Sequence, residues 1–217
     1  MRYFAIALIC FLIGCQSNKK SERVARFHDD GRAKPVVTIV PVIDSTYYNV
    51  PWSISEEFTN IIKNNISKQG NIYFGKENST HLSTTINPFG KDISWAKDLS
   101  NTEFLVFLEL IEHEDVPIVK TVKNPNKIPE IRRSSFNLNI SMRIRIIDVR
   151  KRTPQIVLQE KIKESFYIAN NIEKPNYNTV TLGTKEYKRS PLSKAHTKFS
   201  KKIIDRISDY IMLAKSR

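Results

Sequence analysis

The sequence predicts a single α+β domain, and two patterns carry this prediction. Apolar residues recur at helical spacing in segments 53–68 and 190–215, which is typical of helices with one buried face. Apolar and polar residues alternate strictly from Phe136 to Ile146, which is typical of a half-buried strand. We therefore expect a mostly antiparallel sheet of four to five strands packed with helices, in the order β-α-β-α-β-β-β-α.

Each expected element has local support in the sequence. The run from Val36 to Asp44 is apolar and β-branched, and Pro41 interrupts it because proline cannot donate to a strand ladder. Ser53 or Ser55 can cap the helix that follows, and Gly70 can end it. The other expected elements are strands at 71–74, 104–111, 136–146 and 156–168, a short helix at 92–99, and a final helix with Pro191 in its first turn.

The amino terminus resembles a bacterial lipoprotein signal peptide. Arg2 is followed by an apolar run from Phe4 to Ile13, which is shorter than the ~20 helical residues that span a bilayer but fits a secretory signal. Leu12-Ile13-Gly14-Cys15 then resembles the lipobox. We expect cleavage after Gly14 and acylation of Cys15 with S-diacylglycerol and an N-linked acyl chain such as palmitate. An uncleaved anchor or a buried first helix is the alternative, and the polar residues from Gln16 onward disfavour both.

This interpretation divides the chain into a signal peptide at 1–14, a lipidated, flexible basic tether at 15–34, and one periplasmic domain at 35–217. The formal net charge of +13 would ordinarily suggest nucleic acid or another acidic surface. Export would put nucleic acid out of reach, so we expect no nucleic-acid partner. Cys10 would leave with the signal peptide, so we expect no disulfide. Gln16 after the cysteine favours the outer over the inner membrane.

No pattern typical of catalysis or of a metal site stands out. The sequence has no HExxH and no Gly-x-Ser-x-Gly, and we expect no catalytic residue, metal or cofactor. Glu109, Glu112, His113, Glu114 and Asp115 form an acidic cluster at the expected end of a strand. This cluster fits a solvated strand end, which is what we expect. The alternative is that it forms the acid–base or metal site of a hydrolase.

Basic residues are the candidate docking residues. They are Lys194, Lys198, Lys201, Lys202 and Arg206 on the polar side of the final helix, with Arg143 and Arg145 on the polar face of the long strand. Solvated surface is one interpretation of these residues. The other is docking to an acidic protein, anionic headgroups or an acidic envelope polymer, guided by long-range attraction.

The expected order of elements resembles a group of periplasmic lipoprotein domains. The similarity rests on the opening strand Val36–Asp44, the helix segment Ile54-Ser55-Glu56-Glu57-Phe58-Thr59, the strand end Ile144-Arg145-Ile146-Ile147-Asp148-Val149, and a final helix that opens Pro-Leu-Ser-Lys-Ala. The group includes the curli-secretion lipoprotein, the lipoprotein activators of penicillin-binding proteins and the amino-terminal domain of the TolB translocation protein.

The resemblance implies a membrane-anchored, non-enzymatic adaptor or accessory lipoprotein that binds another envelope component. A cell-wall-modifying or other hydrolase that uses residues 109–115 is one alternative, and a purely structural surface lipoprotein is the other.

Cys15→Ser tests the lipid attachment, because the serine hydroxyl cannot form the thioether that precedes cleavage. We expect the variant to keep residues 1–14 and to take up no acyl label. Intact-mass analysis checks this, and an identical mature species in the variant and the natural protein would contradict it.

Overall fold

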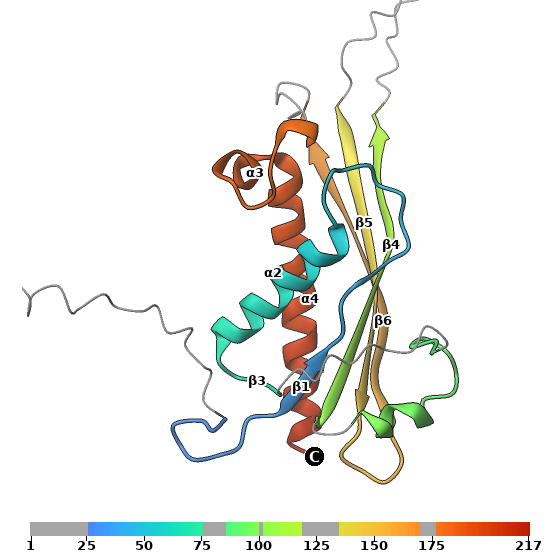
Figure 1. Ribbon diagram of the computed structural model, residues 1–217, viewed down its shortest axis with the longest axis vertical. Coiled ribbons are helices and arrows are strands. Elements are labelled where there is room, and N and C mark those ends of the chain that lie inside the picture. The colour runs from blue at the N-terminus through green and yellow to red at the C-terminus, as the bar shows by residue number, and fades with distance from the viewer. Residues whose placement is uncertain (1–25, 76–85, 100–101, 119–134, 170–176) are drawn as a thin grey trace, which may run out of the picture.

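The computed structural model describes residues 26–75, 86–99, 102–118, 135–169 and 177–217. The expected signal peptide and the expected lipidation site Cys15 both lie outside these residues. The elements are β1 (Val36–Ile39), β2 (Ile43–Asp44), α2 (Ile54–Gln69), β3 (Tyr73–Phe74), η1 (Ser94–Asp98), β4 (Phe104–Pro117), β5 (Phe136–Asp148), β6 (Gln155–Ile168), η2 (Tyr177–Thr179), α3 (Lys185–Arg189) and α4 (Pro191–Lys215). Figure 1 shows the long strands in one layer with α2 and α4 against one of its faces. The predicted α+β class is therefore confirmed.

Within the described residues the sheet is mixed and has six strands, so the prediction of a mostly antiparallel sheet of four to five strands is wrong. The strand order is β3-β1-β4-β5-β6, and β2 also pairs with β4. β1 runs parallel to both β3 and β4, and β2 runs parallel to β4. β5 pairs antiparallel with β4 on one side and with β6 on the other. The parallel pairs arise because α2 carries the chain back between β1 and β3, and such a crossover joins parallel strands.

Several boundaries also differ from the prediction. Pro41 divides the expected strand at 36–44 into β1 and β2, because it has no N–H for the ladder. β4 continues six residues past its expected end at 111, to Pro117. The expected helix at 92–99 is a short 3₁₀ turn, and α3 lies where no element is predicted.

The two long helices begin and end where the sequence predicts. Ser53 accepts a hydrogen bond from the Glu56 N–H at 3.1 Å at the start of α2. Gly70 closes α2 with φ = 71°, a conformation that favours glycine. Ser190 caps α4, and Pro191 occupies its first turn. None of the described helices is both long and apolar enough to cross a membrane.

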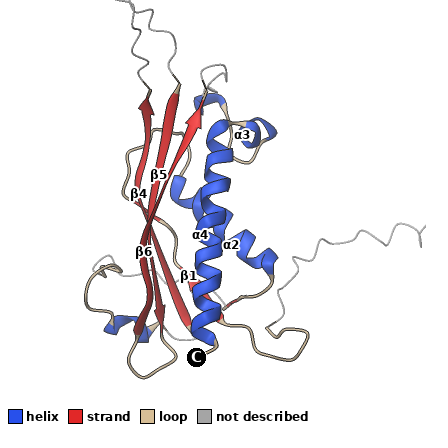
Figure 2. Ribbon diagram, turned by 180° about the vertical axis from the view of Figure 1, so that it is seen from behind, coloured by secondary structure: helices blue, strands red, loops and turns tan. Residues whose placement is uncertain are grey.

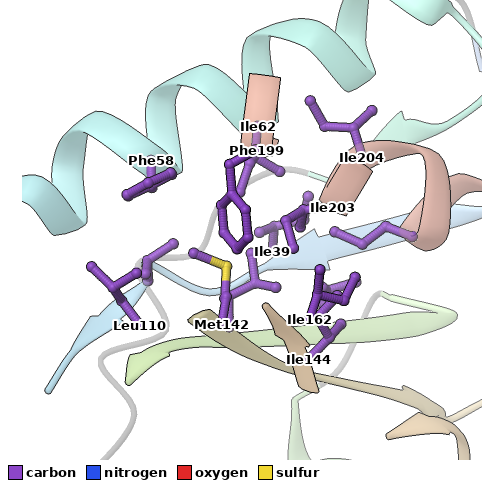
Figure 3. Packing of buried hydrophobic residues seen from close by; sticks show 14 of the residues in the cluster. Ile39, Phe58, Ile62, Leu110, Met142, Ile144, Ile162, Phe199, Ile203 and Ile204 are labelled. Carbon is purple, nitrogen blue, oxygen red and sulfur yellow. The ribbon is translucent and has the colours of Figure 1, made fainter. Parts of the chain in front are cut away.

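The main core lies between the sheet and the two long helices, which cover the same face (Figure 2). Figure 3 shows Phe58 of α2 and Phe199 of α4 above Met142 and Ile144 of β5, and all four are fully buried. A smaller cluster covers part of the opposite sheet face, where η1 and the residues before it pack on β4 and β5. The core therefore fixes α4 along the whole length of the long strands.

Shortening a buried side chain of α4 should destabilise the fold. Ile207 is completely buried, so Ile207→Ala should lower the free energy of unfolding by about 2–5 kcal/mol, because it removes buried area and leaves a cavity. Leu213 on the same helix is 51% exposed, and Leu213→Ala should change the free energy of unfolding by no more than about 0.5 kcal/mol. Urea denaturation of both variants checks this, and equal losses would contradict the assignment of faces.

Candidate functional site

The basic residues of α4 fall into two rows, and the first row is neutralised by β6. Lys202 forms an ion pair with Glu164. Arg206 donates from Nε to Glu160 Oε1 at 2.9 Å and from Nη2 to Oε2 at 2.8 Å. Glu160 and Glu164 lie on the face of β6 that meets α4. These two cations therefore attach the helix to the edge of the sheet.

The second row lines a groove between α2 and α4, which we call the lysine groove. It has a volume of about 660 Å³, and its cationic lining is Lys68 of α2, Lys188 of α3, and Lys194, Lys198 and Lys201 of α4. Asp205 also lines it, together with uncharged side chains such as Asn65 and Ile204. All five lysines are exposed. Three helices that are far apart in the sequence thus place their lysines around one hollow.

The groove has an excess of positive charge that the described protein does not neutralise. None of its five lysines forms an ion pair with an acidic side chain in the described part of the chain. The ammonium nitrogen of Lys198 lies 6.0 Å from the centre of the Phe166 ring. Lys194, Lys198 and Lys201 follow one another at spacings of four and three residues. Like charges at such spacing destabilise a helix by about 0.2–0.5 kcal/mol per pair. An anion in the groove would relieve this repulsion.

Arg143 and Arg145 do not join the groove, because they lie on the opposite face of the sheet. Arg143 Nε donates to Glu109 at 2.9 Å, and its guanidinium lies 4.3 Å from the centre of the Phe89 ring. Arg145 is 3% exposed and donates to the carbonyls of residues 88, 89 and 90 at 2.6 to 2.9 Å. It therefore attaches this segment to the sheet.

The acidic cluster at 109–115 lies in the second half of β4 and not beyond its end. In that half Glu114 is exposed, and Glu109, Glu112 and Asp115 are half-buried. A β-bulge between Leu110 and Glu112 shifts the register by one residue, which exchanges the faces of the side chains beyond it. Glu112 consequently pairs with Lys163 on β6. His113 instead turns inward and is 5% exposed. The cluster is thus divided between the two faces of the sheet.

A buried polar network joins the elements that form the groove. Its centre is the Glu57 carboxylate of α2, which is 3% exposed. It accepts hydrogen bonds from Tyr187 of α3, from Trp52 Nε1 at 2.8 Å, and from His196 Nδ1 of α4 at 2.6 Å. Burial raises the pKa of Glu57, but these hydrogen bonds outweigh burial and hold it below its usual value. The network therefore contains a buried carboxylate with three donors from separate parts of the chain.

The network continues from α4 to the sheet through a pair of histidines. His196 Nε2 lies 2.7 Å from His113 Nε2, so one of these atoms carries a hydrogen and the other accepts it. His113 Nδ1 is buried without a hydrogen-bond partner among the described residues. Burial, and next the neighbouring charge of His196, lowers the pKa of His113 to about 3. Because His196 Nδ1 donates to Glu57, neutral His196 accepts at Nε2 and His113 Nε2 carries the shared hydrogen, so a further proton on His113 would lie on its buried, unpartnered Nδ1.

The sequence signal for this network is an ionisable residue on the apolar face of each long helix. The predicted helices and strands do not take this signal into account. His196 lies four residues after Leu192 and three before Phe199, on the apolar stripe of α4. Glu57 interrupts the stripe of α2 three residues after Ile54. Ionisable residues on a buried stripe need partners. No group of three or more His, Cys, Asp or Glu residues in the described ranges is placed to hold a metal ion.

The described residues thus form an α+β fold with an unneutralised basic hollow between two helices. Over residues 23–215 the chain matches the model of a family of unknown function, DUF7499, and it belongs to that family. No curated protein sequence matches the chain significantly.

Solved structures of several bacterial proteins match this chain. The hypothetical protein CT253 from Chlamydia trachomatis is 23% identical, with a TM-score of 0.62, and the match covers 82% of this chain and 98% of that one. Lipoprotein GNA1162 from Neisseria meningitidis is 8% identical, with a TM-score of 0.39 over 81% of this chain and 99% of that one. The PelC dodecamer from Paraburkholderia phytofirmans is 11% identical, with a TM-score of 0.39 over 79% and 86%. The first of these supports the fold described above.

The buried histidine pair predicts that acid destabilises the protein. The pKa of His113 is about 3 in the folded state and about 6.5 when unfolded. The contribution of neutral His113 to the free energy of unfolding is therefore complete above pH 6.5. It is lost as the pH falls toward 3, because in this range only the unfolded chain takes up the proton. Urea denaturation should show the free energy of unfolding falling between pH 7 and pH 5.

His113→Gln separates this effect from other titrations, because a glutamine amide can donate to His196 but does not titrate. We expect a flatter dependence between pH 7 and pH 5 in this variant, whatever its absolute stability. His28→Gln, which lies outside the network, should keep the natural slope. An unchanged slope in His113→Gln would contradict the assignment.

Proposed function

We propose that this protein is a lipid-anchored envelope adaptor that binds an acidic partner in the lysine groove. In this proposal Cys15 carries the acyl chains, the domain faces the periplasm, and the outer membrane is favoured over the inner. The partner is an acidic envelope protein or an anionic envelope polymer. The protein acts by binding it and performs no reaction of its own.

The observation that carries the proposal is the contrast between the two rows of cations on α4. Lys202 and Arg206 are neutralised by β6, whereas the three lysines of the other row share the groove with two more from α2 and α3. If these charges served only solubility, their convergence on one hollow would have no physical reason. A cluster of like charges at one concave site raises the local concentration of anions and favours their binding.

The buried network supports the proposal by fixing the groove walls. Glu57, Tyr187 and His196 come from α2, α3 and α4, the same three helices that carry the five lysines. A site whose walls are held rigid loses less entropy when it binds a ligand. The groove is therefore preorganised although its charged side chains are long.

The anchor is supported by the lipobox at residues 12–15 and by the resemblance to periplasmic lipoprotein domains. The alternative of a hydrolase at residues 109–115 has less support, because the bulge in β4 separates these side chains. Glu109 and Glu112 are held by Arg143 and Lys163 on one face. Asp115 accepts a hydrogen bond from Tyr48.

Binding of a fluorescent poly-L-glutamate by the full-length lipidated protein in neutral detergent tests the groove. We expect Lys194→Gln, Lys198→Gln and Lys201→Gln together to weaken binding about tenfold, because exposed charge pairs contribute up to about 1 kcal/mol each. Salt should weaken binding to the natural protein more than to the variant, since exposed charges are screened within ~8 Å at physiological ionic strength. Fluorescence anisotropy across a salt series measures both effects.

A matched control removes the same net charge elsewhere. Lys91, Lys151 and Lys161 are exposed and lie outside the groove, so replacing all three with Gln should leave binding nearly unchanged. Equal losses in the two triple variants would mean that net charge alone attracts the polymer, and the groove would not be a binding site.

A further inference from the structure

The end of the molecule opposite α3 exposes apolar side chains where β6 begins and α4 ends. Ile156 is 41% exposed, Met212 38% and Leu213 51%. Ile156 and Leu213 line a hollow of about 320 Å³ with Val157 and Tyr210. Apolar surface left in water costs roughly 25 cal/mol per Å². This end of the domain therefore favours a partner that removes these side chains from water.

Cations surround the apolar residues. Arg150, Lys151 and Arg152 are consecutive in the turn from β5 to β6, and Arg217 follows α4. Arg150 is held by Asp148 and by the carbonyl of Ala214. Lys151, Arg152 and Arg217 form no ion pair within the described residues. An apolar centre with free cations at its rim is typical of surfaces that rest on anionic bilayers.

The path of the chain brings this end toward the proposed anchor. In Figure 1 the first described residues, drawn in dark blue before β1, lie at the same end of the molecule as the carboxyl terminus. Arg26 follows Cys15 by eleven positions, and a chain of that length spans at most about 40 Å when fully extended. A lipid on Cys15 would therefore hold Arg26, at this end of the domain, within about 40 Å of the bilayer.

We infer that this end of the domain is a bilayer-contact surface for an anionic leaflet. Ile156, Met212 and Leu213 enter the boundary between headgroups and acyl chains, while Lys151, Arg152 and Arg217 contact anionic headgroups. The lysine groove lies about 20 Å further along α4, at the helical rise of 1.5 Å per residue, so it stays open to the periplasm. This inference rests on the lipid anchor of the proposed function and assigns the surface that the anchor presses against the membrane.

A fluorescent label on Leu213→Cys tests the contact directly. The acylated protein has no other thiol, so an environment-sensitive NBD group attaches at one position. We place the labelled, full-length lipidated protein in phosphatidylcholine vesicles with and without phosphatidylglycerol, and quench the label with doxyl-lipids. We expect quenching several-fold stronger in anionic vesicles than for the same label on Glu186→Cys, an exposed position of α3 at the other end.

Charge removal tests the role of the rim. Each cation near an anionic leaflet contributes about fivefold to binding, so Lys151→Gln, Arg152→Gln and Arg217→Gln together should abolish most of the quenching at position 213. Lys91→Gln and Lys161→Gln should leave it unchanged. Loss of quenching in the control variant as well as in the rim variant would show that net charge attracts the protein to the vesicle, and would overturn the assigned surface.

Flotation and intact mass separate the possible failures. In the first case the protein carries acyl chains and floats with vesicles, but the label at position 213 is quenched no more than the label at position 186. This result would overturn the bilayer contact and leave the anchor intact. Protein without acyl mass that does not float overturns the anchor and the contact with it. A label that is shielded without lipid quenching, in protein of doubled mass, would show that a second copy covers this surface.

Discussion

The buried Glu57 carboxylate is the constraint on which the arrangement of the helices depends. A carboxylate in a protein interior is tolerated only when donors satisfy it, and its donors come from α3, α4 and the segment before α2. Separating the helices would take these donors away from the carboxylate. The orientation of α2 relative to α4, and hence the width of the lysine groove, follows from this electrostatic requirement as much as from apolar packing.

The helix α4 carries four surfaces, and each has a different physical role. Its apolar stripe packs on the sheet, and one row of cations holds the edge strand β6. A second row lines the groove, and its last turns expose apolar residues beside free cations. Because the helix is 25 residues long, these surfaces are distributed along and around a single rigid element. The proposed binding of a partner and the proposed contact with a membrane could then occur at once without either blocking the other.

The sequence predicts the elements better than their pairing. Strict periodicity identifies α2, α4 and β5, because each buries one continuous face and carries its own caps. The parallel pairing of β1 with β4 is decided by a crossover through α2, and local patterns contain no direct measure of it. The inward position of His113 could not be predicted either, because a bulge changes the phase of β4 after Leu110.

The docking residues illustrate the same limit. Helical spacing alone places Lys194, Lys198, Lys201, Lys202 and Arg206 together on a polar side. Only the position of Glu160 and Glu164 on β6 divides them into neutralised and unneutralised rows. Arg145 had the pattern of an exposed strand residue, but the 88–90 segment covers it. Long-range neighbours determine whether a surface charge is free, and a single sequence does not contain them.

The bulge in β4 has a consequence for how this family can vary. Because the bulge accommodates one additional residue, deleting the codon for Ile111 would restore strict alternation, with Leu110 and His113 still on the core side and Glu112 still on the other face. The strand would still form, and its composition would scarcely change. A family member can therefore differ by one residue in the length of this strand segment, and a relative that lacks this residue would have its buried histidine two positions after the residue equivalent to Leu110.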